Sequence, residues 1–104
     1  MNILLVCAAG ASSTCMAQSM NRAAKKMGRD DITVRAQSEY EMEGYLEDAD
    51  VCLIGPHLKN LESSLQEVAK EYNVPAKCIS SEAYGMLDGE LGIKEALRIL
   101  EERK

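Results

Sequence analysis

The sequence has no tryptophan, no phenylalanine and only four tyrosines among its 104 residues. Aliphatic side chains and six methionines must therefore fill the core of the fold. No apolar run is long enough to cross a bilayer. The run at residues 3–6 has no basic lead-in and is too short for a secretory signal. We therefore expect a cytoplasmic protein with no direct membrane insertion.

An excess of positive charge is also missing. Seventeen acids stand against twelve lysines and arginines, and the formal net charge of −5 argues against nucleic acid as a main partner. The charge is unevenly spread, because every acid comes after Arg29 while four bases precede Asp30: Arg22, Lys25, Lys26 and Arg29. This acid-free segment is either a solvated helix face or a face toward an anion or an acidic partner.

Metal and redox motifs are absent as well. The cysteines Cys7, Cys15, Cys52 and Cys78 form no C-x-x-C pair, and His57 is the single histidine. We expect no metal and no cofactor, and without a secretory signal the even cysteine count is poor evidence for disulfides. Cys15, Cys52 and Cys78 are expected to pack as small side chains, with a resolving thiol for Cys7 under oxidation as the alternative for Cys15. Cys7 is the exception, because it follows the first predicted strand.

Hydrophobic periodicity predicts four strands that alternate with helices. The strands are expected at residues 2–6, 32–36, 51–54 and 76–79. The helices are expected from a cap at Ser13 or Thr14 to Gly28, from a capping box of Ser38 with Glu41, along Leu58 to Tyr72, and along Ile93 to Leu100, with a loop at 80–92.

This alternation predicts one α/β domain over residues 1–104. We expect a doubly wound four-stranded parallel sheet of order 2-1-3-4 with helices on both faces. Ligands of such sheets bind beyond the carboxyl ends of the strands, at the point where the strand order reverses. That point lies between the first and third strands, so Cys7, which follows the first strand, is expected at its mouth.

Small residues follow Cys7 and lead directly into a helix. Gly10 permits a positive φ, so successive N–H groups can form an anion nest, and the helix N-terminus adds partial positive charge. A thiol in such a place is a good nucleophile, and a phosphoryl group on its sulfur would meet the same donors. The alternative is a structural role, in which Cys7 is a buried cysteine beside a turn. The predicted phosphate loop consists of Ala8, Ala9, Gly10, Ala11, Ser12, Ser13 and Thr14.

Three blocks of the sequence resemble the IIB component of a sugar phosphotransferase system, in the lactose, cellobiose and chitobiose family. They are ILLVCAAGASST at 3–14, ADVCLIGP at 49–56 and YGMLDG at 84–89. The resemblance covers nearly the whole chain and includes a similarity of architecture to low-molecular-weight tyrosine phosphatases. Cys15 stands where the family often has an aliphatic residue, and Ala11 where methionine is frequent.

The resemblance implies a phosphotransferase whose Cys7 becomes phosphocysteine. Cys7 would accept a phosphoryl group from a phosphohistidine of the IIA protein. It would then pass the group to a sugar, such as cellobiose, chitobiose or lactose, held by the membrane protein IIC. The protein would be recruited through IIC to the inner face of the membrane.

A low-molecular-weight tyrosine phosphatase or arsenate reductase acting through Cys7 is the alternative. Those enzymes need an arginine six residues after the cysteine, because its planar fork binds phosphoryl oxygens, and Ser13 stands there. They also use an Asp-Pro general acid, whereas Gly55 and Val74 precede the two prolines. No glycine-rich nucleotide motif supports a plain binding module, and Ile54-Gly55 stand where a receiver domain needs aspartate.

Several further residues are candidates for the pocket rim or the partner surface. His57 follows a strand and a Gly-Pro pair, and it fits a helix start or the rim. Tyr84 and Asp88 follow the fourth strand, on the same edge as Cys7, although Asp88-Gly89 could equally be only a turn. The bases Arg22, Lys25 and Lys26 are expected to help partner contact.

Overall fold

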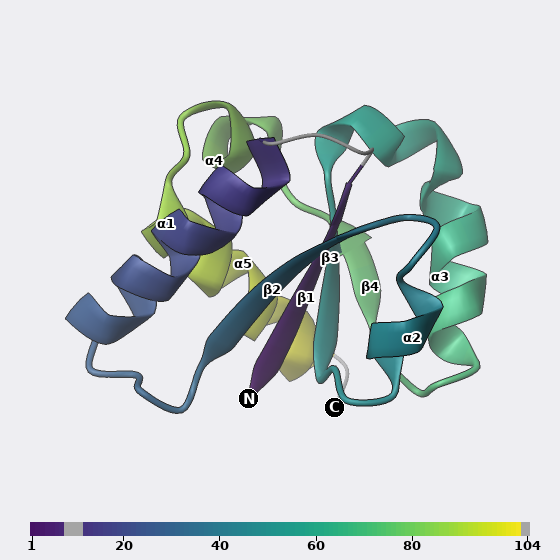
Figure 1. Ribbon diagram of the computed structural model, residues 1–104, viewed down its shortest axis with the longest axis horizontal. Coiled ribbons are helices and arrows are strands. Elements are labelled where there is room, and N and C mark those ends of the chain that lie inside the picture. The colour runs from purple at the N-terminus through teal and green to yellow at the C-terminus, as the bar shows by residue number, and fades with distance from the viewer. Residues whose placement is uncertain (8–11, 103–104) are drawn as a thin grey trace.

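The computed structural model describes residues 1–7 and 12–102 (Figure 1). Its strands are β1 (Asn2–Cys7), β2 (Thr33–Ser38), β3 (Val51–Ile54) and β4 (Ala76–Cys78). Its helices are α1 (Ser12–Lys26), α2 (Glu43–Leu46), the 3-10 helix η1 (Pro56–Leu61), α3 (Glu62–Lys70), α4 (Ser81–Gly85) and α5 (Gly89–Glu102).

The four strands form one parallel sheet in the order β2-β1-β3-β4, which confirms the predicted order. β1 lies between β2 and β3, with Leu5 opposite Ala36 on one side and opposite Leu53 on the other. Its continuous apolar run suits this central place, because helices cover both faces of the sheet. All strand carboxyl ends therefore meet at one edge, which is the upper edge in Figure 1.

Side-chain alternation along the strands divides the core into two clusters. Ile3 and Leu5 of β1 pack on the face covered by α1 and α5, together with Met16, Met20 and Ile93. The intervening β1 side chains pack on the opposite face with residues of α2, η1 and α3 (Leu4, Val6, Leu46, Leu58 and Leu65). Methionines and aliphatic residues fill both clusters, as the lack of phenylalanine and tryptophan predicts.

Helix α1 ends as its sequence predicts. Gly28 adopts a left-handed φ of 74°, and the N–H of Arg29 donates to the carbonyl of Ala24 at 2.8 Å. This is a Schellman ending, which glycine favours because it has no Cβ. The Asn21 side chain holds the helix to β2, since its amide bonds both the N–H and the C=O of Val34.

The region of Leu58 to Tyr72 differs from the prediction of one continuous helix. Pro56 opens the 3-10 helix η1, whose Leu58 has φ −104° and ψ 17°, and α3 starts only at Glu62. Tyr72 lies beyond α3 and is 37% exposed instead of lying on the buried helix face. The apolar spacing located the buried Leu58 and Leu65, but it misplaced Tyr72 and did not detect the change of helix type.

Two other expectations are wrong. Residues 80–92 are not a loop, because they contain α4 and the first turn of α5. Ser38 does not cap α2, because it continues β2 and pairs with Cys7, and α2 starts at Glu43 with no side-chain cap. Sheet pairing of Ser38 therefore replaces the capping box that its spacing to Glu41 suggested.

Candidate functional site

Cys7 is the last residue of the central strand β1, at the carboxyl edge of the sheet. It pairs with Ser38 of β2 on one side, while Val6 pairs with Ile54 of β3 on the other. The cysteine thus lies at the predicted point where the strand order reverses, although it ends the strand instead of following it. Its residue surface is only 2% exposed.

Gly55 lies directly against Cys7. Its N–H donates to the carbonyl of Val6 at 2.7 Å, and a Cβ built on Gly55 would stand 2.9 Å from the Cβ of Cys7. Any larger residue here would therefore push on the cysteine. Gly55 was not among the predicted site residues. The signal that could have found it is the Gly-Pro pair at the end of a strand predicted beside the first.

Helix α1 starts five residues after Cys7. The helix begins at Ser12, so Ser13 and Thr14 lie within its first turn and do not precede it as caps. Thr14 is exposed. The predicted loop residues Ala8, Ala9, Gly10 and Ala11 lie outside the described residues, as do the side chains of Ser12 and Ser13.

His57 and Tyr84 meet across the end of β3. Their ring centroids are 5.7 Å apart and the rings cross at 74°, an edge-to-face arrangement. Tyr84 is buried in the core cluster beneath α1 and α5, whereas His57 is exposed on η1, two residues after Gly55. The structure therefore brings both predicted rim residues to the Cys7 edge.

Asp88 has a structural role at the start of α5. Its carboxylate accepts a hydrogen bond from the N–H of Leu91 at 3.1 Å, as an N-cap does. The neighbouring Gly89 packs so closely on α1 that an added Cβ would lie 2.1 Å from the carbonyl oxygen of Ser19. Asp88 thus caps α5, and Gly89 is the point where α5 packs on α1.

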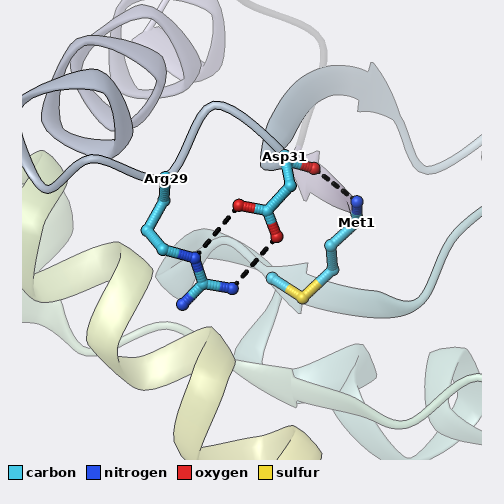
Figure 2. A network of polar contacts seen from close by, with 3 residues as sticks. All are labelled: Met1, Arg29 and Asp31. Atoms are coloured by element: carbon cyan, nitrogen blue, oxygen red, sulfur yellow. Dashed lines mark hydrogen bonds and ion pairs between the residues drawn. The ribbon is translucent and has the colours of Figure 1, made fainter.

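The basic residues lie at the other end of α1 from Cys7. Lys25 and Lys26 occupy the last turn, and Arg22 stands one turn earlier. Arg29 is engaged with Asp31 through two hydrogen bonds of 3.1 Å, and the Met1 amino group donates to the Asp31 carbonyl (Figure 2). The hydrogen bond from Arg29 lowers the pKa of the Asp31 carboxyl.

The other cysteines occupy three different environments. Burial raises the pKa of the Cys52 thiol to about 12. Burial, with the nearby Glu62 carboxylate, raises the pKa of Cys78 to about 11. Both are therefore protonated, inert thiols at neutral pH. Cys15 is exposed, which corrects the expectation that it is packed.

Two surface hollows are lined by residues other than Cys7. One hollow of about 240 Å³ lies over the N-terminal halves of β1 and β2, beside Arg35 and Tyr45. Another of about 400 Å³ lies between β4 and α5.

Residues 1–7 and 12–102 hold no cluster of three metal-ligating side chains. Within the same ranges, no helix combines the length and hydropathy that a membrane span requires.

These features define a class of protein: a doubly wound parallel α/β fold with a cysteine at its switch point, before the N-terminus of a helix. Residues 2–95 match the family described as "PTS system, Lactose/Cellobiose specific IIB subunit". The chain belongs to this lactose/cellobiose-specific IIB family of the sugar phosphotransferase system, and its members are phosphotransferase components.

Relatives of known name agree with this assignment. The oligo-beta-mannoside-specific EIIB component of Bacillus subtilis (strain 168) is 33% identical over 98 residues, which cover 94% of each chain. The galactose-specific EIIB component of Lactococcus lactis subsp. cremoris (strain MG1363) is 30% identical over 93 residues, which cover 85% of each chain. Both match this chain over most of its length.

Solved structures show the same fold. The cellobiose-specific IIB component from Borrelia burgdorferi superimposes with a TM-score of 0.79 at 29% identity, covering 100% of this chain and 94% of that one. The lactose-specific IIB component from Streptococcus pneumoniae gives 0.78 at 14% identity, covering 99% and 96%. At the lower identity, the likeness extends to the fold alone.

Proposed function

We propose that this chain is a phosphoryl carrier that works through Cys7. Cys7 takes a phosphoryl group from a phosphohistidine of IIA and passes it to a sugar held by the membrane protein IIC. The observation that carries the proposal is the position of Cys7, which ends the central strand between β2 and β3 in a chain of the IIB family. The protein would act at the inner face of the membrane as one domain over residues 1–104.

The transfer consists of two displacements at phosphorus. The Cys7 thiolate attacks the phosphorus of the phosphohistidine, the P–N bond breaks as the S–P bond forms, and the imidazole keeps the electron pair. The thiol proton leaves to solvent or to that imidazole. A sugar hydroxyl then attacks the phosphorus and releases its proton to solvent, the S–P bond breaks, and the sulfur keeps the electron pair as a thiolate.

The segment after Cys7 would hold the phosphoryl group. N–H groups of residues 8–11 and of the first turn of α1 are the proposed donors, since a helix N-terminus favours an anion. Hydroxyls of Ser12, Ser13 and Thr14 would add to this site. His57 and Tyr84 would form its rim, because they meet beside Gly55, which touches Cys7.

The sugar would be a β-linked disaccharide such as cellobiose, chitobiose or lactose. Relatives of this chain are named for oligo-beta-mannosides, galactose and cellobiose. The phosphatase alternative lacks its arginine, because Ser13 holds the required position within α1. A relay benefits from that absence, since a guanidinium would also stabilise transfer to water.

Replacing Cys7 with serine tests the proposal. An alcohol is a poor acceptor and a poor leaving group here, so Cys7→Ser should lower phosphoryl transfer by about a thousandfold or more. The measurement is mass spectrometry of the Cys7 peptide after incubation with phosphoenolpyruvate, the general phosphotransferase proteins and IIA. Cys15→Ser is the matched control and should be phosphorylated as wild type. A Cys7→Ser protein that supports sugar phosphorylation at the wild-type rate would exclude this role.

A further inference from the structure

Two apolar side chains are exposed to solvent where α4 ends. Met86 is 81% exposed and Leu87 is 42% exposed, in the short turn between α4 and α5. We call this pair the Met86–Leu87 turn. Single exposed apolar residues are ordinary, but two adjacent large ones on a small acidic protein form a patch suited to a partner.

The backbone conformation of this turn is unfavourable for leucine, the residue at position 87. Leu87 adopts a left-handed φ of 51°. The N–H of Asp88 donates to the carbonyl of Ala83 at 2.8 Å, and the N–H of Leu87 donates to Tyr84 at 3.3 Å, which is a Schellman ending. A branched side chain rarely adopts this conformation.

Two other helices of the chain end in the same way with suitable residues. Gly28 holds the left-handed position after α1, with φ 74°, and Asn73 holds it after α3, with φ 60°. Glycine and asparagine adopt this conformation at little cost, whereas leucine adopts it at a higher cost in free energy. Leu87 therefore breaks a local rule that the chain otherwise obeys. Such exceptions concentrate at functional surfaces.

Contacts place the turn beside the Cys7 edge. Tyr84, two residues before Met86, meets the ring of His57, and His57 follows the Gly55 that touches Cys7. On the other side, Gly89 packs on the backbone of Ser19 in α1. Figure 1 shows α4 next to the end of α1 that follows β1. The turn therefore continues a surface that starts at the candidate phosphoryl site.

The adjacent face of α1 is free of acids and becomes basic along its length. Its exposed residues are Thr14, Cys15, Gln18, Arg22, Lys25 and Lys26. Across residues 1–7 and 12–102, no ion pair involves Arg22, Lys25 or Lys26, although the chain carries seventeen acids. A complementary partner would offer an apolar recess with carboxylates beside it.

We infer that the Met86–Leu87 turn anchors the IIA donor, with the basic end of α1 facing carboxylates of that protein. The inference rests on the proposed function. Between the two partners, IIA fits better, because the cytoplasmic loops of membrane proteins carry an excess of lysine and arginine that would repel this face. An apolar anchor with charges around it is the usual arrangement of an interface hot spot.

The test is the double variant Met86→Ser with Leu87→Gly. Glycine removes the unfavourable left-handed leucine, so the thermal unfolding midpoint should stay level or rise. Single-turnover transfer from phosphorylated IIA should need about tenfold more IIA for half-saturation, while the rate at saturation stays unchanged. Tyr72→Ser is the matched control, because Tyr72 is 37% exposed after α3, at the other end of the strands. This variant should change neither the IIA concentration at half-saturation nor the rate at saturation.

The outcomes separate this inference from the proposed function. If wild type accepts phosphate on Cys7 and the variant shows the same half-saturation, the inference is wrong and the carrier role stands. An equal loss in transfer to IIC, or in binding to phosphatidylglycerol vesicles, would also overturn the assignment to IIA. If wild type itself takes no phosphate, the proposed function fails instead.

Discussion

At the scale of single residues, position decides which thiol can react. Cys7, Cys52 and Cys78 all lie in strands, yet only Cys7 ends a strand at the switch point. Cys52 lies inside β3, and burial alone raises its pKa to about 12. The environment of each thiol therefore follows from its place in the sheet, and not from cysteine content.

Burial of the Cys52 thiol makes stability depend on alkaline pH. Its pKa rises from 9.0 in the unfolded chain to about 12 in the fold, so above pH 9 the unfolded state loses the proton first. Stability is therefore lost as pH rises from 9 toward 12. Cys52→Val removes this effect, so wild type should lose about 1.4 kcal/mol relative to the variant per pH unit above 9. Urea unfolding at pH 7.5, 9.5 and 10.5 measures the difference in the free energy of unfolding between wild type and variant. A difference that stays the same at all three pH values would contradict the prediction.

At the scale of elements, the close packing of α1 and α5 supports the site. The two helices cover one face of the sheet, and Gly89 and Gly92 are the points where α5 approaches α1. At Gly92 an added Cβ would meet the flexible Met16 and Met20 side chains, at 2.9 and 3.1 Å. At Gly89 it would meet backbone, which cannot move aside. This contact fixes the start of α5 and hence the turn before it.

Replacing Gly89 with alanine should destabilise the fold. The new Cβ would lie 2.1 Å from the Ser19 carbonyl oxygen, so the helices must separate, at a cost of about 3 kcal/mol in the free energy of unfolding. Gly44→Ala is the control, because nothing lies within 4 Å of that position in α2. It should be neutral or stabilise by up to ~1 kcal/mol. Urea unfolding compares the two, and equal effects would contradict the packing argument.

At the scale of the whole molecule, charge is polarised along the chain. The acids all follow Arg29, while Arg22, Lys25 and Lys26 lie toward the end of α1. They stand away from Cys7, so they cannot contact a phosphoryl group held there. Their effect on transfer must come from long-range attraction of a partner, which salt screens.

Neutralising the three bases tests this attraction. The triple change Arg22→Gln, Lys25→Gln and Lys26→Gln should slow transfer from IIA about tenfold at low salt. At roughly 0.5 M salt the effect should fall below about twofold, because screening shortens the range of the charges. Glutamine at Lys70, Lys77 and Lys94 alters the net charge equally and is the control. An equal effect of both triples, or none at any salt, would show that the basic end of α1 is only solvated surface.

The amino-acid sequence alone was enough to predict most of the fold and the place of Cys7 at the carboxyl edge of the sheet. Apolar runs marked the four strands, because strands buried on both faces need them, and the alternation with helices implied the parallel order. The small residues after Cys7 marked the edge where chemistry would lie. These features are local, so they can be recognised without knowing which segments meet.

Only the tertiary structure decided what depends on contacts between distant segments. Gly89 and Gly92 read as loop residues by propensity, yet they belong to α5, and they are glycines where α1 leaves no room for a Cβ. Ser38 joins β2 because the hydrogen-bonded ladder with β1 extends to Cys7. Gly55 touches Cys7, and His57 meets Tyr84, only because parallel strands bring their carboxyl ends to one edge. Packing overrides local preference where backbones approach closely, and no local pattern encodes that approach.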